Sequence, residues 1–323
     1  MAAIQASTTG GRGRSNSGPA FPFGADLAYA RRRRLFLLLL GAPAVVYVLV
    51  VAGWPLAQGI WYSVFDYSLL HPATRHFVGL ENYVALWTDP GARNSVVVTV
   101  EFTVAAVALE FLLGLGLALL LWRDGRFERI SLALLLIPVT VTPVAVGLVF
   151  RALLAPDFGL IGYHAAEAGL SIPRGFLGDP HAALPAVVFI DTWEWTPLMA
   201  LILLAGLKAL PTDIIEAARA DGATAWQRLR IVILPMLLPA IFLALVLRTM
   251  DAFRVFDIVF ATTAGGPGDA TNVLMFYAVK QGLQFFNVGF AAAIANSMVL
   301  VIAIFATALI LLVRRADRRA NEA

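Results

Sequence analysis

Long uncharged stretches constrain this 323-residue chain more than any other feature of its sequence. The stretch LFLLLLGAPAVVYVLVVAG, residues 35–53, carries no charged side chain. At about 1.5 Å per residue, a helix of that length crosses a hydrocarbon core of about 30 Å. Because backbone polar groups in lipid must be satisfied within helices or closed barrels, such a stretch predicts a transmembrane helix.

Similar runs of Leu, Val, Ala, Ile and Phe recur along the chain and predict an all-α membrane protein with six transmembrane helices. Their approximate bounds are 35–55, 95–122, 131–153, 183–207, 231–262 and 289–313. The composition, 60% hydrophobic and 14% charged, lies outside the range of water-soluble proteins. A cleaved signal peptide is the alternative for the first run, but the run is longer than the apolar h-region of a usual signal peptide and further spans follow.

Arginine and lysine side chains gather at the ends of the apolar runs on one side. They are Arg31–Arg34, Arg123, Arg126, Arg129, Lys208, Arg219, Arg228, Arg230, Arg314, Arg315, Arg318 and Arg319. The positive-inside rule makes that side cytoplasmic, and an even number of spans places both termini there. We therefore predict a flexible basic cytoplasmic N-terminal tail (1–34), a transmembrane domain (35–313) and a cytoplasmic C-terminal tail (314–323). Because the basic residues lie at the ends of spans, we do not expect the chain to bind nucleic acid.

The absence of cysteine excludes disulfides, thiolate metal sites and cysteine nucleophiles. The sequence also lacks the metalloprotease motif H-E-x-x-H, the nucleophile motif G-x-S-x-G and the ATP-binding motif G-x-x-x-x-G-K. We therefore expect no catalytic site, no bound metal and no cofactor in this chain. Any ATP-driven step would require another subunit.

The polar stretch EAARADGATAWQRLRIVILPMLLPA, residues 216–240, precedes an apolar span and predicts two short helices. Asp213 is the expected N-cap of the first helix, with Glu216 as its capping-box acid. Gly222 suits the left-handed position that ends such a helix. The sequence ATAWQRLR, residues 223–230, then begins the second. From spacing alone, the element is either a reinforced loop or a surface that transmits force to a partner.

Four motifs, in order along residues 35–313, resemble those of a known family. Three are FVGLENYVALWTDP (77–90), FRVFDIVFATTAGGPGDAT (253–271) and FFNVGFAAAIANSMVL (285–300). The fourth joins Glu216-Ala217-Ala218, Asp221-Gly222-Ala223, Ile233-Leu234-Pro235 and Pro239. The chain resembles permease subunits of binding-protein-dependent ATP-binding cassette (ABC) importers, in the branch that includes maltose, trehalose and glycerol-phosphate permeases.

The resemblance implies the type I ABC importer permease architecture in a bacterial cytoplasmic (inner) membrane. Residues 213–228 would form a coupling helix that contacts an ATPase subunit through Glu216, Ala217, Ala218, Asp221, Gly222 and Ala223. The implied partners are a second, related permease, a dimer of ATPase subunits that holds ATP and Mg, and an extracytoplasmic solute-binding protein. The implied substrate is a carbohydrate, and lipid surrounds the spans.

Ionisable side chains within the spans are candidates for a substrate site, since each costs about 2.5 kcal/mol or more at membrane depth. Asp191 and Glu194 are three residues apart on one helical face, beside Trp193 and Trp195. Carboxylates accept hydrogen bonds from sugar hydroxyls, and indole rings offer apolar faces to sugar C–H groups. The predicted substrate-binding residues are Asp191, Trp193, Glu194, Trp195, Asp251 and Asn296. Glu110 receives no predicted role.

Alternating charges at intervals of three, Arg248, Asp251, Arg254 and Asp257, follow in the fifth predicted span. Such a ladder can pair with itself or, at Asp251, contact substrate. We predict gating or structural roles for Arg248, Arg254, Asp257, Gly265, Gly266 and Pro267. A secondary transporter of a small polar solute is the alternative function, although that class usually has more spans and an inverted repeat. A membrane enzyme is a third class.

Overall fold

The computed structural model of the chain describes residues 23–71, 73–122, 125–169, 172 and 174–322. The chain divides into two compact units, residues 1–57 and 58–323. Residues 1–22 of the predicted tail, and Arg123, lie outside the described residues.

The described part of the first unit is helical. Helix α1 (Phe23–Val48) continues through a π-helical turn, η1 (Leu49–Gly53), into α2 (Trp54–Ser63), which belongs to the second unit from residue 58 on. The first transmembrane helix of the prediction is therefore present, with an apolar stretch over Phe36–Ser63. Because α1 begins at Phe23, residues 23–34 are helical, although the sequence led us to expect a flexible tail there. Alanine, leucine and arginine, all strong helix formers, dominate this segment.

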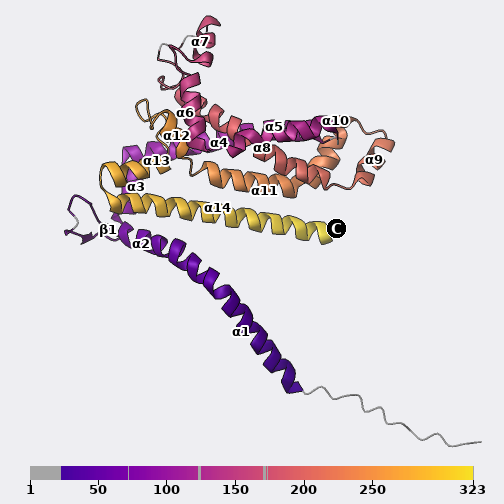
Figure 1. Cartoon of the computed structure of the whole chain (residues 1–323), viewed down its shortest axis with the longest axis horizontal. Helices are drawn as coiled ribbons and strands as arrows, with labels where there is room; N and C mark the ends of the chain where they lie inside the picture. The colour runs from indigo at the N-terminus through magenta and orange to yellow at the C-terminus, as the bar shows by residue number, and fades with distance from the viewer. Residues whose placement is uncertain (1–22, 72, 123–124, 170–171, 173, 323) are drawn as a thin grey trace, which may run out of the picture. The chain divides into compact units, whose positions relative to one another are not determined.

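The second unit is a helical bundle with one short hairpin. Its elements are β1 (Phe65–Asp66), β2 (His76–Phe77), α3 (Glu81–Thr88), α4 (Pro90–Leu121), α5 (Arg126–Thr140), α6 (Pro143–Leu153), α7 (Leu160–Glu167), α8 (Ala183–Lys208), α9 (Thr212–Ala220), α10 (Ala225–Gln227), η2 (Arg228–Ile233), α11 (Leu234–Ala252), α12 (Asp257–Thr262), α13 (Leu274–Val279), η3 (Lys280–Gln284) and α14 (Val288–Glu322). Helices α4, α8 and α11 lie side by side, with α9 and α10 at one end (Figure 1).

Five described helices are long and apolar enough to cross a membrane: Phe36–Ser63, Pro90–Leu121, Ala183–Lys208, Ala225–Ala252 and Val288–Ala308. The predicted span 131–153 is instead a helix pair, 130–140 and 143–153, bent by 94°. Proline causes the break, since Pro143 has no N–H to continue a helix and keeps Thr142 extended at ψ 138°. The count reaches six if this bent pair is one span.

The predicted span 231–262 is also interrupted, so its four charged residues at intervals of three do not lie on one continuous helix. Helix α11 ends at Ala252 and α12 begins only at Asp257. Phe256 takes φ −141° and ψ −52°, which lies outside the helical region, so Asp257 starts a new helix. At the other end of the chain, α14 continues to Glu322, through the predicted C-terminal tail.

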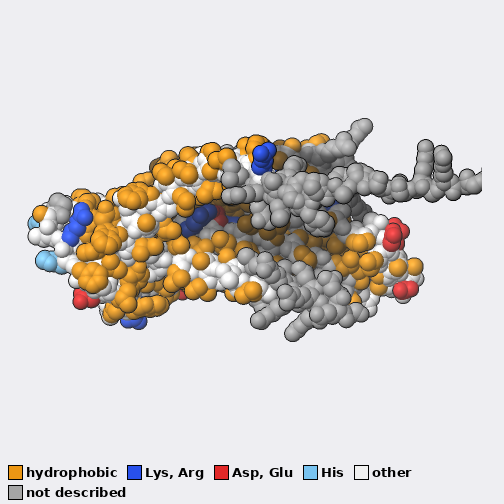
Figure 2. All heavy atoms as spheres, turned by 90° about the horizontal axis from the view of Figure 1, so that it is seen from below, with side chains coloured by type: hydrophobic (Ala, Val, Ile, Leu, Met, Phe, Trp, Pro, Cys, Tyr) orange, Lys and Arg blue, Asp and Glu red, His pale blue; other side chains and the backbone are white. Residues whose placement is uncertain are grey.

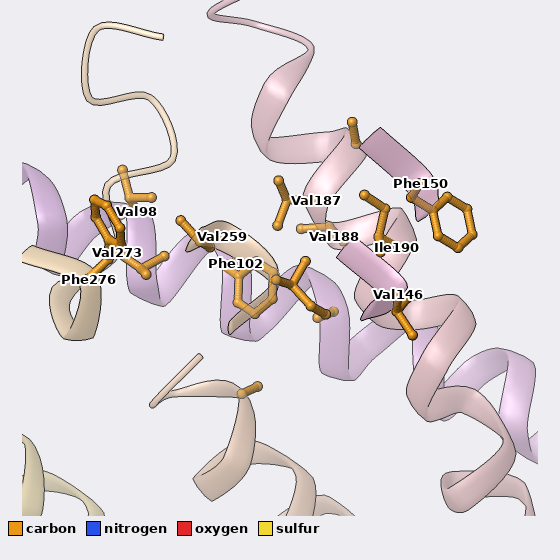
Figure 3. Packing of buried hydrophobic residues seen from close by; sticks show 14 of the residues in the cluster. Val98, Phe102, Val146, Phe150, Val187, Val188, Ile190, Val259, Val273 and Phe276 are labelled. Carbon is orange, nitrogen blue, oxygen red and sulfur yellow. The ribbon is translucent and has the colours of Figure 1, made fainter. Parts of the chain in front are cut away.

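The largest apolar core joins α4, α6, α8, α12 and α13. Figure 3 shows side chains from these elements packed together: Val98, Phe102, Val146, Phe150, Val187, Val188, Ile190, Val259, Val273 and Phe276. Small residues permit the close approach of the helices. A Cβ on Gly114 of α4 would lie 2.8 Å from Cγ of Met199 on α8, and one on Gly147 would lie 2.7 Å from Cβ of Ala261.

The outer surface of the helices is apolar as well. Figure 2 shows hydrophobic side chains over most of the described surface on one face, with few charged groups between them. Large exposed side chains occur on each long helix, among them Leu112, Leu120, Phe189, Leu243 and Leu300. Exposed apolar area on this scale is typical of helices that face lipid.

Candidate functional site

A buried arginine stands at the centre of the bundle. Arg248, near the end of α11, donates from Nε to Oε2 of Glu110 at 2.6 Å and from Nη2 to Oε1 at 2.9 Å. Glu110 belongs to α4 and is fully buried. The contact is therefore a two-point, planar clamp between the guanidinium and the carboxylate, the strongest geometry that such a pair can adopt.

Two further carboxylates contact the same guanidinium. Nη2 of Arg248 also donates to Oδ2 of Asp191 on α8, and Nη1 donates to Oδ2 of Asp251 at 3.0 Å. Asp191, which the sequence suggested as a substrate-binding residue, thus also has a structural partner in Arg248. One side chain thus joins α4, α8 and α11, and the i, i+3 pairing predicted for Arg248 and Asp251 is present.

The outer end of the charge series is more open. Arg254 donates from Nη2 to Oδ1 of Asp251 at 3.3 Å, and its side chain is 66% exposed. Among the described residues, Arg254 therefore pairs with Asp251 and not with Asp257, the partner suggested by the predicted ladder. The break after Ala252 explains the difference, because Asp257 begins the separate helix α12.

A cavity of about 280 Å³ lies beside Arg248. Its lining consists of Pro143, Asp191, Trp195, Arg248, Asp251, Arg254, Val255, Phe256, Asp257 and Ile258. We call it the outer cavity. The ring of Trp195 lies 5.2 Å from Cζ of Arg248, within the range of a cation–π contact. The cavity therefore combines one indole face, three carboxylates and two guanidinium groups.

The two candidate tryptophans of α8 lie on different sides of the helix. Trp193 packs edge-on against Phe150, with ring centroids 5.2 Å apart. It lines a separate apolar cavity that also includes Pro138 and Phe189. Residues two apart on a helix point in nearly opposite directions, so Trp193 and Trp195 cannot share a site. The structure brings only Trp195 to the outer cavity.

Glu194 is buried beside the cluster with an oxygen unpartnered. The residue is 1% exposed, and Oε2 has no hydrogen-bond partner among the residues that the structure describes. It lies one helical turn from Asp191, as the spacing predicted. Asn296 is elsewhere: Nδ2 lies 3.5 Å from the hydroxyl of Tyr83, so it links α14 to α3 and does not line the outer cavity.

Gly265, Gly266 and Pro267, which were predicted to have gating or structural roles, lie in a turn that Thr271 contacts. Thr271 donates from Oγ1 to the carbonyl of Gly266 at 2.6 Å. Gly265 has φ +83°, and a Cβ there would lie 2.8 Å from the ring of Phe276, so the position requires glycine. Gly266 and Pro267 line another cavity of about 390 Å³ together with Arg151 and Arg174.

A tyrosine fixes the start of α4 to α13. Tyr277 donates from its hydroxyl to Oδ1 of Asp89 at 2.7 Å, and the same oxygen accepts from the N–H of Ala92 as the cap of α4. Burial raises the pKa of the Tyr277 phenol, and the hydrogen bond to Asp89 and the charge of Asp89 raise it further. The phenol therefore stays protonated and keeps donating this bond at physiological pH.

Residues 212–228, in the polar stretch, form two short helices joined by a turn, and we call this element the double turn. Helix α9 begins at Thr212 after the N-cap Pro211, so the predicted cap at Asp213 was wrong: extended Pro211 takes that position, and Asp213 lies in the first turn. Gly222 has φ +81°, as predicted. A capping box does occur, but at Thr224, whose N–H donates to Oε1 of Gln227 at 2.8 Å.

Much of this double turn is exposed to solvent. Glu216, Ala217, Asp221 and Gly222 are exposed, and Ala218 and Ala223 are half-buried. Arg228 reinforces the turn by donating from Nη1 to the carbonyl of Ala223 at 2.6 Å. The six residues predicted for coupling thus lie together on one rigid element.

Residues 110–322 match the family model of the binding-protein-dependent transport system inner membrane component. The chain belongs to this family. The permease is 36% identical over 265 residues to the trehalose/maltose transport system permease protein MalF of Thermococcus litoralis, which covers 82% of this chain and 87% of that protein. It is 35% identical over 270 residues to the trehalose transport system permease protein SugA of Mycobacterium tuberculosis, with 82% and 84% covered.

A solved structure confirms the architecture of the permease. A chain in the crystal structure of a bacterial ABC transporter that imports the acidic polysaccharide alginate superposes with a TM-score of 0.76. The sequences are 20% identical, and the match covers 90% of this permease and 99% of that chain. The fold is therefore that of an ABC importer permease, and the resemblance in the sequence is confirmed.

Sequence reasoning missed two features of the permease. Glu110 had no motif to mark it, and only its position as an acid within an apolar run signalled a buried partner. Thr224 and Gln227 form an S/T-x-x-E/Q pattern, so this capping box could have been predicted from the sequence.

Proposed function

We propose that this permease is the transmembrane subunit of an ATP-driven carbohydrate importer and forms half of the translocation path. The relatives named for trehalose and maltose transport support this proposal. The observation that carries it in this chain is the outer cavity, which places the indole of Trp195 beside several carboxylates on helices long and apolar enough to cross a membrane. Carbohydrates combine apolar C–H faces with hydroxyl donors and so match that lining.

The partners follow from the family and from the absence of an ATP-binding motif. They are a second, related permease, an ATPase dimer that holds ATP and Mg, and an extracytoplasmic solute-binding protein. One solved neighbour is an alginate transporter in complex with a periplasmic protein bound to an alginate pentasaccharide. The chain would lie in a bacterial inner membrane with both termini cytoplasmic, and residues 35–313 would form the permease domain.

The charges of the outer cavity favour a neutral carbohydrate. Its lining contains three aspartates, Asp191, Asp251 and Asp257, against two arginines. Arg248 is already neutralised by buried carboxylates and offers little attraction to an anion. Asp257 and the outer side of Asp251 remain to accept hydroxyl hydrogen bonds, and Trp195 provides the apolar face. A neutral di- or oligosaccharide fits this balance better than a sugar phosphate.

Coupling would pass through the double turn at 212–228. ATP binding closes the ATPase dimer, moves this element and switches the cavity between inward-facing and outward-facing states. The exposed α9 and the capping box at Thr224 favour a rigid contact, because a floppy loop would transmit little force. Glu216, Ala217 and Asp221 would lie in the ATPase interface.

A pair of tryptophan variants tests the substrate site. Trp195→Ala removes the indole from the outer cavity, whereas Trp193→Ala removes an indole from the other side of the same helix. Uptake of maltose or trehalose would be measured in vesicles that contain the whole complex, at limiting concentrations of loaded binding protein.

We expect Trp195→Ala to lower uptake by about five-fold, the loss of roughly one aromatic contact. Trp193→Ala should leave uptake near wild type. Equal uptake by both variants and wild type, in complexes assembled to the same level, would show that the outer cavity is not the carbohydrate site.

A further inference from the structure

A second cavity adjoins the outer one along α8 and α11. It has a volume of about 260 Å³, and we call it the inner cavity. Its lining consists of Trp195, Leu198, Met199, Ile202, Ala244, Leu247, Arg248, Asp251 and Arg254. Four of these side chains, Trp195, Arg248, Asp251 and Arg254, also line the outer cavity. The two spaces are therefore separated by one shared wall.

The two cavities follow one another along helices α8 and α11. Leu198 and Ile202 lie after Trp195 on α8, and Ala244 lies before Arg248 on α11. Both directions lead toward the end of the bundle where α8 ends and α9 and α10 lie (Figure 1). The outer cavity instead extends past the end of α11 to Ile258. The inner cavity is thus nearer to the double turn.

The two arginine side chains shared by the cavities differ in how firmly they are held. Arg248 is buried and held by Glu110, Asp191 and Asp251, so moving it would leave charges unpaired in an apolar interior. Arg254 is mostly exposed and contacts Asp251 at 3.3 Å, and Asp251 is itself 37% exposed. Exposed ion pairs of this kind contribute little to stability and exchange readily with water or a ligand.

We propose that the Asp251–Arg254 ion pair is a gate between the outer cavity and an inner binding station for the same carbohydrate. This proposal rests on the proposed function and adds a second site to it. The inner cavity offers mainly aliphatic side chains beyond the shared wall, so it holds a hydroxyl-rich ligand weakly. A weak binding site in the inner cavity, after a tighter one in the outer cavity, allows the ligand to leave toward the cytoplasm.

Cysteine labelling tests the gate in the assembled complex, because this chain has no native cysteine. Ile202→Cys marks the inner cavity, and Val255→Cys marks the outer one. Each is combined with Arg254→Ala, with Arg254→Lys, and with the control Arg151→Ala, which alters an arginine of a different cavity. A membrane-impermeant thiosulfonate is added outside intact cells, without sugar, and the labelling rate of this chain is measured.

We expect Val255→Cys to label quickly in combination with every arginine variant. Ile202→Cys should label slowly when Arg254 and Arg151 are both unchanged, and this protein is the parent. Arg254→Ala should speed labelling of Ile202→Cys by about five-fold, the effect of losing an exposed ion pair. Arg254→Lys and Arg151→Ala should leave the rate near that of the parent. An unchanged rate in Arg254→Ala, or slow labelling of Val255→Cys, would overturn the proposed gate. Since no sugar is present, neither result bears on the tryptophan test of the carbohydrate site.

Discussion

At the scale of single residues, Arg248 organises the interior of the permease. Its contact with Asp251 was predictable, because i, i+3 positions face each other on a helix. Its clamp with Glu110 was not predictable from spacing, since the two residues are 138 positions apart and meet only when α4 packs beside α11. The orphaned oxygen of Glu194 was equally hidden, because burial depends on the neighbouring helices.

Removal of Glu110 should destabilise the permease strongly. Glu110→Ala leaves the buried guanidinium of Arg248 without its two-point partner, and breaking a buried pair costs about 3–5 kcal/mol. Glu110→Gln should cost less, because the amide oxygen still accepts one hydrogen bond. Glu101→Ala, an exposed acid on the same helix, is the matched control and should change little. The thermal unfolding midpoint of the purified complex is the measurement; equal midpoints for Glu110→Ala and Glu101→Ala would contradict the clamp.

At the scale of elements, the length of the apolar stretches predicted the long helices well. It did not predict the positions at which these helices are interrupted. The interruption at 141–142 lies inside an apolar run, and the one at 253–256 lies among the charged residues near the end of the predicted span 231–262. Pro143 signals the first break, but the sharp 94° bend also needs packing of α6 against α12, which sequence patterns do not contain. The second break contains no proline, and neither the apolar pattern nor a helix-breaking residue marks the position at which Phe256 leaves the helical region.

The double turn at 212–228 makes a prediction about glycine. A Cβ at Gly222 would meet no atom within 4 Å, so Gly222→Val causes no clash. Its φ of +81° nevertheless costs a β-branched residue about 1 kcal/mol or more, which tilts α9 against α10. We expect Gly222→Val to insert in the membrane but to lose co-purification with the ATPase subunit.

Gly116→Val is the matched control for this test, because Gly116 lies within α4 and its added Cβ also meets no atom within 4 Å. It should retain the ATPase subunit. Loss of the ATPase from both variants, or from neither, would argue against a coupling role for the double turn.

At the scale of the whole molecule, the permease is one part of a larger machine. The chain has apolar helices that cross a membrane and an exposed polar double turn at one end of the bundle, but no ATP-binding motif. The fold of an importer permease was predictable because several motifs occurred in order along the chain. The substrate site was predictable only in part, since the sequence could not show that Trp193 and Trp195 serve different surfaces.

Uptake of labelled maltose or trehalose into vesicles tests the central claim, an ATP-driven importer, most directly. The permease would be reconstituted with its partner permease, the ATPase subunits and the loaded binding protein, and each component would be omitted in turn. We expect accumulation only when ATP reaches the ATPase side and the binding protein is present on the other side, with no accumulation by the permease alone. Carbohydrate accumulation by this chain alone, driven by an ion gradient and indifferent to ATP, would contradict the account and identify a secondary transporter.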